Sequence, residues 1–282
     1  MKRLEPLNIA HADVFDACVS EVSNGGVKTL FLLEKARILA EFDGYGVKAG
    51  SNNLYSSVYC DRAKPKQVII GGLVKEDFVF LYGSCMVKKP AGRKFYDKII
   101  LLAPSGKCPL CGFGHATTLD HVLPKARYPL FSVLSTNLVP ACTDCNKLKG
   151  ASLVTKDEQA LHPYFESDVI ETEPWVYAEI IQDTPVTVKY FVSPPPEWCP
   201  EQSRRACNYF SDLNLAGRFA IEAASELSSL ISFLKYLKND NSVADHLSAM
   251  ADGERDIRLN SWKSALYQAL SVNKWFIGGG FR

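Results

Sequence analysis

The chain has 282 residues, of which 47% are hydrophobic and 22% charged, and its net charge is +1. This composition is ordinary for a globular protein with a buried core, and it argues against a wholly basic nucleic-acid coat. No stretch reaches the roughly 20 apolar residues of a membrane span, and the opening MKRLEPLNIAHADVFD lacks the apolar run of a signal peptide. We therefore expect a cytoplasmic protein with no membrane partner.

Residues 1–86 are expected to form a mainly helical N-terminal region. Apolar residues recur at intervals of three and four over residues 12–22 and, after the break Asn24-Gly25-Gly26, over residues 27–42. A Gly- and Asn-rich loop is expected from 44 to 53. Residues 77–87 are ambiguous between strand and helix, and 95–103 resemble a helix that leads into the next region.

Residues 167–282 are expected to form a hairpin followed by helices. The β-formers of 175–182 and 186–192 flank Asp183-Thr184-Pro185, which predicts two strands joined by a short loop, and three prolines at 194–196 end the hairpin. Helical patterns then cover 203–215, 217–239, 242–253 and 261–276. The glycines at 278–280 indicate a helix stop or a flexible terminus.

The region between them, residues 87–166, holds the candidate catalytic and metal-binding residues. Four of the nine cysteines form two Cys-x-x-Cys pairs: Cys108 and Cys111 in CPLCG, and Cys142 and Cys145 in CTDCN. Two such pairs are typical of a structural Cys₄ zinc site, which is tetrahedral and closed to water. The other five cysteines show no such spacing, and we expect buried or partly buried thiols there.

Positive charge is concentrated around these pairs. The segment from Lys88 to Lys149 contains ten basic and three acidic residues, so its net charge is +7 and that of the rest of the chain is −6. A local positive field suits a polyanionic ligand, although such a run can also be a solvated face.

The sequence around the two cysteine pairs resembles the HNH endonuclease superfamily of ββα-metal nucleases with a four-cysteine zinc. The matching segments are CPLCG, LDHVLPK and NLVPACTDCNKLKG. The likeness covers about 45 residues. It implies an α+β fold with a central ββα core at 87–166, and it implies metal-dependent hydrolysis of phosphodiester bonds in DNA. The flanking sequence also resembles that of uncharacterised bacterial HNH proteins of similar length. The resemblance further implies a role in defence, beside a partner protein such as an ATPase.

The resemblance also implies a role for each motif residue. His121 is the general base, and Asp120 and Asn146 are the protein ligands of a catalytic Mg²⁺ or Mn²⁺, for which oxygen ligands are suited. Asn137 braces the loop between the two strands and holds the backbone of His121. Because neighbours on a strand point to opposite faces, Asp120 and His121 could flank one scissile bond from two sides.

Nucleic acid, taken as double-stranded DNA, is the expected partner. The candidate phosphate contacts are Lys125, Arg127, Lys147 and Lys149, with Lys149 alternatively capping its helix. His115 could replace a cysteine at the zinc, and His162 is expected to be structural. The alternative function is a zinc-stabilised nucleic-acid or protein binding module without catalysis.

Overall fold

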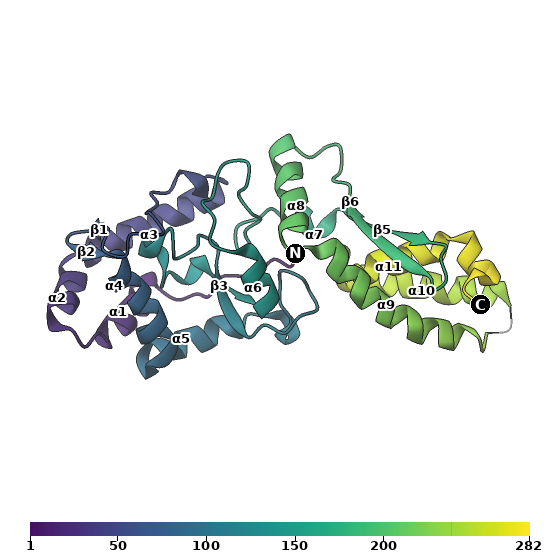
Figure 1. Ribbon diagram of the computed structural model, residues 1–282, viewed down its shortest axis with the longest axis horizontal. Coiled ribbons are helices and arrows are strands. Elements are labelled where there is room, and N and C mark those ends of the chain that lie inside the picture. The colour runs from purple at the N-terminus through teal and green to yellow at the C-terminus, as the bar shows by residue number, and fades with distance from the viewer. Residues whose placement is uncertain (238) are drawn as a thin grey trace. The chain divides into compact units, whose positions relative to one another are not determined.

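The computed structural model describes residues 1–237 and 239–282 (Figure 1). It is 54% helical and 10% strand, which makes the fold α+β. The chain divides into two compact units: one is Lys2–Glu166, and the other is Ser167–Arg282 together with Met1. Within the described residues, no helix combines the length and apolarity that a membrane span requires.

The unit of residues 2–166 contains six helices and two short antiparallel strand pairs among its named elements. In chain order these are α1 (His11–Ser20), α2 (Gly25–Leu33), α3 (Lys35–Gly50), β1 (Val68–Ile70), β2 (Leu73–Val74), α4 (Lys75–Phe80), α5 (Pro90–Ile100), β3 (Thr118–His121), β4 (Leu138–Ala141) and α6 (Thr143–Lys149).

Two sequence predictions in this unit were wrong. The helix expected over 27–42 is interrupted at Glu34, where α2 ends and α3 begins. The loop expected over 44–53 is largely helical, since α3 continues to Gly50. Tyr45 and Ala49 lie on the buried face of α3, with Tyr45 fully buried. Burial of that face outweighs the helix-weakening glycines, each of which costs about 1 kcal/mol relative to alanine.

The ambiguous segment 77–87 is helical in the structure. It forms the end of α4 and then a π-helical turn, Leu81–Met86. Leu81, Cys85 and Met86 are fully buried there, so the continuous apolar run reflects a helix enclosed by the core. Tyr82 belongs to the same turn and faces the region of β3.

One hydrophobic core extends through this unit, from Leu4 to Tyr164. Edge-to-face aromatic pairs join its helices: the rings of Phe15 and Phe31 are 6.0 Å apart, and those of Phe31 and Phe78 are 5.3 Å apart. Residues on both sides of position 86 contribute to this core. The strand pair β3–β4 is therefore supported by helices that precede it in the chain.

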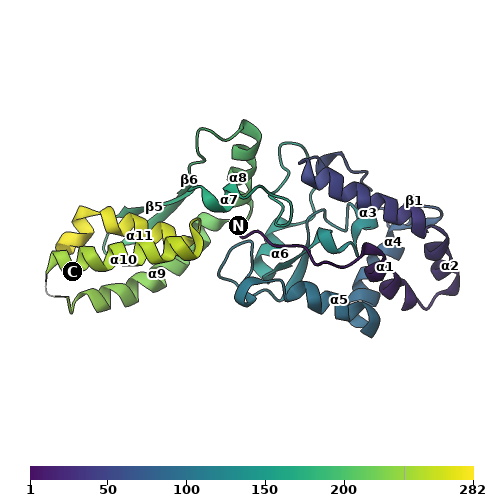
Figure 2. The same cartoon turned by 180° about the vertical axis from the view of Figure 1, so that it is seen from behind.

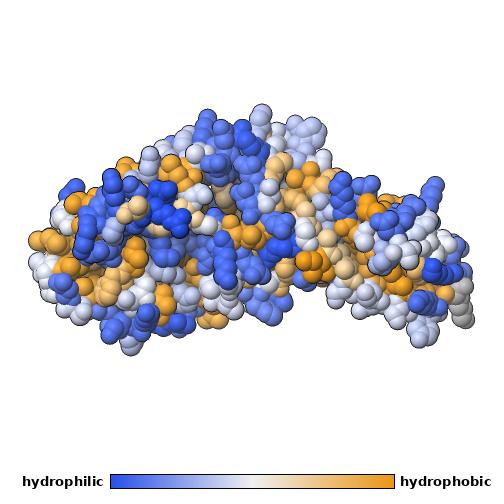
Figure 3. Space-filling view, viewed as in Figure 1, coloured by the Kyte–Doolittle hydropathy of each residue, from blue (hydrophilic) through white to orange (hydrophobic). Residues whose placement is uncertain are grey.

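The segment before α1 is extended (Figure 2) and bonds to two loops of the same unit. The N–H of Lys2 donates to the carbonyl of Pro109 (2.8 Å), and the N–H of Leu4 donates to the carbonyl of Pro163 (2.9 Å). On the face seen in Figure 3, hydrophilic side chains are dense over this unit, with small apolar patches between them.

The unit of residues 167–282 consists of a hairpin packed against helices. Its elements are α7 (Val169–Thr172), β5 (Val176–Ile181), β6 (Thr187–Val192), α8 (Pro200–Asp212), α9 (Leu215–Leu234), α10 (Asp240–Arg258) and α11 (Trp262–Val272). The predicted hairpin is confirmed by the antiparallel pairing of β5 with β6. The predicted helix over 217–239 includes position 238, which lies outside the described residues; the observed α9 ends at Leu234. Cys199 is exposed, in contrast to the expected buried thiol.

Asn260 organises this second unit through its buried amide. Its Oδ1 accepts from the N–H groups of Trp175 (2.9 Å) and Val176 (3.2 Å), and its Nδ2 donates to the carbonyls of Ile170 (3.0 Å) and Glu173 (2.8 Å). A single side chain thus replaces the backbone partners that the start of β5 lacks.

Candidate metal centre and active site

The four paired cysteines form one buried cluster. The sulfur atoms of Cys108, Cys111, Cys142 and Cys145 all lie within 4.8 Å of one another. A tetrahedral zinc with Zn–S bonds of about 2.3 Å requires S–S edges of about 3.8 Å. The Sγ atoms of Cys111 and Cys142 are 3.8 Å apart, so these residues could hold a structural zinc ion.

The backbone around the cluster is shaped for bound thiolates. The N–H of Gly114 donates to Cys111 Sγ and the N–H of Cys145 donates to Cys142 Sγ, both at 3.4 Å. A Cβ on Gly114 would lie 2.9 Å from Cys142 Sγ, so glycine is required for this close approach. Hydrogen bonding among the sulfurs lowers the pKa of the Cys111 and Cys142 thiols and raises that of Cys108 and Cys145. The backbone donors to Cys111 and Cys142 favour the deprotonated sulfur that zinc binds.

The cluster closes one end of an antiparallel strand pair. Thr118 pairs with Ala141, and His121 pairs with Leu138 at the opposite end. Cys108 and Cys111 precede β3, whereas Cys142 caps the start of α6, which directly follows β4. The order of elements is therefore strand, strand, helix, and β3 and α6 are labelled in Figure 1. The cysteines lie at the end of the strand pair where α6 begins.

Asn137 holds the other end of the pair. Its Oδ1 accepts from the N–H of Leu123 (2.7 Å) and from the hydroxyl of Tyr45 (3.0 Å). Its Nδ2 donates to the carbonyls of Leu123 and Phe131, both at 3.1 Å. The side chain is fully buried, and its four hydrogen bonds fix the loop that follows His121.

A buried hydrogen-bond chain orients this amide. The N–H of Tyr164 donates to His162 Nδ1 (3.2 Å), so the proton of the neutral imidazole is on Nε2, 2.9 Å from the hydroxyl of Tyr45. Tyr45 in turn donates to Asn137. His162 is thus a structural histidine, as the sequence indicated, and its contacts are with the loop brace.

His121 lies at the end of β3 and is 5% exposed. Its Nε2 lies 2.9 Å from the carbonyl of Ser132, and since a carbonyl can only accept, Nε2 carries the proton. The ring packs edge-to-face against Tyr82, with centroids 4.4 Å apart. Burial, with the charge of Lys125 adding to it, lowers the pKa of His121 to about 3. The imidazole is therefore neutral near pH 7, with the Nδ1 lone pair available as an acceptor.

Asp120 lies beside His121 in β3 and forms a buried ion pair. Lys149 Nζ donates to Asp120 Oδ2 (2.6 Å) and also to the carbonyl of His121 (3.1 Å). Burial raises the pKa of the Asp120 carboxyl, and the ammonium of Lys149 partly offsets this rise. The sequence predicted a phosphate contact or a helix cap for Lys149, whereas the structure places its charge on Asp120.

Asn146 lies one turn before Lys149 on α6 and faces the start of β3. Its Nδ2 donates to Thr118 Oγ1 (3.1 Å) and to the carbonyl of Leu119 (3.4 Å). These bonds engage the nitrogen side of the amide and direct its oxygen away from them. Asp120 and Asn146 thus carry their side-chain oxygens on two adjacent elements, β3 and α6.

The remaining predicted basic residues occupy different surroundings. Lys125 is partly buried, with its Nζ 5.3 Å above the ring of Tyr82, and burial lowers its pKa. Arg127 lies in the same loop but lines a surface hollow, and Lys147 is exposed on α6. His115 is exposed and lies 3.3 Å from Lys107 Nζ, outside the cysteine cluster.

Sequence reasoning missed the residues that surround His121 and Asn137. Tyr82, Ser132 and Tyr45 are distant in sequence from the side chains they contact, and none lies in a motif. Only the fold brings them together. A helical assignment of 77–87 would have been the one available signal, because it makes Tyr82 part of a buried helix.

The arrangement defines a class of protein: an α+β chain with a strand-strand-helix unit, a four-cysteine cluster and a neutral buried histidine beside a carboxylate. The chain is 31% identical to protein Ea31 of Escherichia phage lambda over 297 aligned residues, which cover 99% of this chain and 100% of Ea31. It therefore belongs to the Ea31 family. No family model and no solved structure matches the chain.

Proposed function

We propose that this chain is a metal-dependent endonuclease of the HNH type that hydrolyses phosphodiester bonds in DNA. The observation that carries the proposal is the state of His121: its Nε2 is fixed on the carbonyl of Ser132, which leaves Nδ1 as a neutral acceptor, and the preceding residue of β3 is Asp120. A general base needs this combination of fixed orientation and free lone pair.

His121 would take the proton of the attacking water. Its ring is held between the Ser132 carbonyl and the Tyr82 ring, so the direction of Nδ1 does not depend on substrate. The low pKa makes it a weak base that is unprotonated at every physiological pH. Asn137 acts through position only, by holding the loop that begins directly after His121.

Asp120 and Asn146 would hold one divalent ion, Mg²⁺ or Mn²⁺, which supplies charge stabilisation at the leaving oxygen. Asp120 leaves β3 on the face opposite to His121, so the two neighbours suit opposite sides of an in-line displacement. Lys149 shares the Asp120 carboxylate and adds positive charge there. Water attack opposite the 3′ oxygen yields 5′-phosphate and 3′-hydroxyl ends.

The cysteine cluster would act by structure alone. A zinc held by four thiolates has no open position for water. Lys125, Arg127 and Lys147 remain the proposed phosphate contacts, since such contacts position nucleic acid without reading its sequence.

Supercoiled plasmid incubated with Mg²⁺ tests the proposal. We expect nicked or linear product from the wild-type chain and a loss of at least about 10² in rate for His121→Ala. His246→Ala, a histidine of the other unit, is the matched control and should keep the wild-type rate. Ligation and phosphatase treatment of the products then test the end chemistry, and 3′-phosphate ends would contradict the mechanism.

One observation favours a second candidate, a zinc-stabilised binding module without catalysis. The carboxylate of Asp120 already has a cationic partner in Lys149 at 2.6 Å, so its charge is compensated without a metal ion. Under this alternative the chain binds DNA, and wild type and His121→Ala are equally inactive toward plasmid.

A further inference from the structure

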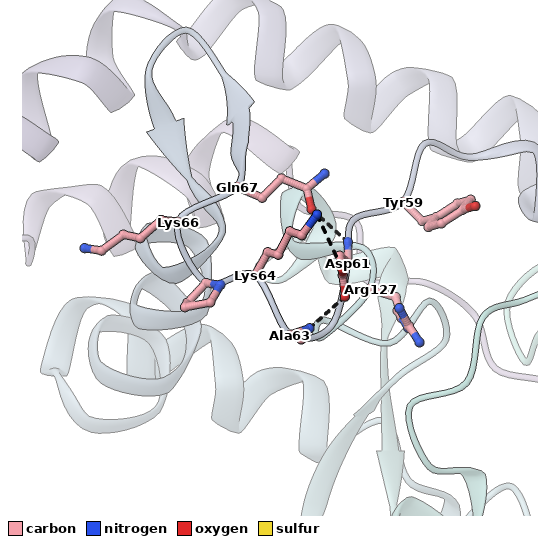
Figure 4. Close-up of a pocket in the computed structure, with 8 residues that line it drawn as sticks. Tyr59, Asp61, Ala63, Lys64, Lys66, Gln67 and Arg127 are labelled. Atoms are coloured by element: carbon pink, nitrogen blue, oxygen red, sulfur yellow. Dashed lines mark hydrogen bonds and ion pairs between the residues drawn. The ribbon is translucent and has the colours of Figure 1, made fainter.

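The loop of residues 57–67 and the loop that follows His121 together form a surface hollow of about 1140 Å³ (Figure 4). It is larger than the roughly 300–1,000 Å³ of most small-molecule sites. The side chains that line it are those of Tyr59, Asp61, Ala63, Lys64, Pro65, Lys66, Gln67 and Arg127. Three are cationic and one is acidic, so the lining favours an anionic occupant.

The floor of the hollow is fixed before any ligand arrives. The buried Lys75 donates from Nζ to the carbonyls of Asp61 (3.1 Å) and Arg62 (2.7 Å). The N–H of Asp61 donates to Gln67 Oε1 (2.8 Å), and the N–H of Cys60 donates to the carbonyl of Arg127 (2.7 Å). These bonds join the backbone of the two loops into one surface without substrate.

The cations differ in how far they are already neutralised. Lys64 is 3.8 Å from Asp61, and Lys66 pairs with Glu76; these are solvent-exposed pairs of the kind that contribute little and break easily. Arg127 makes no ion pair among the described residues, although its charge acts on the Asp61 carboxyl of the same hollow, and its buried Nε has no hydrogen-bond partner there. Its charge is therefore only partly compensated, and an anion in the hollow can interact with it.

The chain itself connects the hollow to the candidate active site. Arg127 lies six residues after His121, and an extended chain spans at most about 3.4 Å per residue, so their Cα atoms are no more than about 20 Å apart. Each strand of duplex DNA carries one phosphate per 3.4 Å of axis, so this distance corresponds to about six nucleotides. Lys125, over Tyr82, lies between them in the sequence.

We infer that this hollow binds the phosphate backbone of the DNA within about six nucleotides of the scissile bond, through Lys64, Lys66 and Arg127. The inference rests on the proposed nuclease function and adds a second contact region to it. Affinity there comes from charge, so it is independent of sequence and sensitive to salt.

The test compares Lys64→Ala/Lys66→Ala with Lys88→Ala/Lys89→Ala, a pair of exposed lysines in the same unit that removes the same charge. Binding of a labelled duplex is measured without Mg²⁺ from about 50 to 200 mM salt. We expect the hollow variant to lose about tenfold in affinity and about two units of the salt slope. The control pair should lose less than half of that.

A second arm locates the contact. The cut is mapped, and duplexes are shortened stepwise from either side of it. Shortening one flank below about six nucleotides should weaken wild-type binding as much as the double substitution does, and should weaken the variant no further. Equal behaviour of the two lysine pairs, or additive effects of substitution and shortening, would overturn the inference. Binding without cleavage would instead overturn only the proposed catalysis.

Discussion

The two ends of the β3–β4 pair are held in different ways. At the Thr118–Ala141 end, four thiols converge within 4.8 Å and suit one zinc ion. At the His121–Leu138 end, one amide, Asn137, makes four hydrogen bonds to groups from three parts of the chain. The first end can be completed by local sequence and a metal, whereas the second depends on the surrounding fold. Asp120 and His121, two residues of the proposed active site, lie toward the second end.

Removing zinc should give the largest effect. Apparent zinc-binding free energies of structural sites are about 10–16 kcal/mol, which exceeds the stability of most domains. We expect about one zinc per chain by elemental analysis and expect Cys142→Ser to lose it and to unfold the unit of residues 2–166. Cys199→Ser, an exposed free thiol, is the control and should retain both. Well-folded wild-type protein without zinc would disprove this role of the cluster.

Asn137→Ala tests the opposite end. The substitution leaves the N–H and carbonyl of Leu123 and the carbonyl of Phe131 buried without their partner. We expect a loss of about 3 kcal/mol or more in the free energy of unfolding, measured by urea denaturation, with zinc content unchanged. Asn241→Ala, at an exposed position, should change stability by less than about 0.5 kcal/mol. A similarly small effect at Asn137 would mean that the brace is dispensable.

Acidification should destabilise the protein through His121. Its folded-state pKa of about 3 lies below the 6.5 of the unfolded chain, so between these values the unfolded state binds the extra proton and stability falls as pH falls. From pH 6.5 to 4.5 this costs up to about 3 kcal/mol. The raised pKa of Asp120 acts in the opposite direction and offsets part of the loss. His121→Gln should flatten this dependence in urea titrations, and an unchanged slope would contradict the burial argument.

Lys149→Met should have the smallest effect, and it should strengthen metal binding where most substitutions at a site weaken it. The proposed divalent ion would have to compete with the Lys149 ammonium for the Asp120 carboxylate, because like charges on one carboxylate repel. We expect Mn²⁺ affinity, measured by calorimetry, to rise about tenfold, equal to about 1.4 kcal/mol. Lys147→Met, on the exposed side of α6, is the matched control. Unchanged or weaker Mn²⁺ binding would show that Lys149 does not compete.

The first end of the pair was predictable from sequence, and the second only in part. Cysteine spacing alone predicted a cluster of four, because ligands at two tight turns have few other arrangements. The position of Asn137 was predicted from resemblance, but its partner Tyr45 was not, since the glycines near it indicated a loop. Likewise, the position of Lys149 in the sequence does not indicate that it pairs with Asp120. That ion pair depends on how α6 packs over β3.

The hydrogen-bond chain from His162 through Tyr45 to Asn137 determines the smallest fragment of this protein that could keep the geometry around His121. A fragment containing only the strand-strand-helix unit would carry every motif residue, yet it would lack Tyr45, the Tyr82 ring and the helices that hold them. Grafting that fragment into another scaffold would transfer the cysteine cluster but leave the loop after His121 without its brace. The transplantable unit is therefore residues 2–166 as a whole, and shorter truncations should lose the orientation of His121 before they lose zinc.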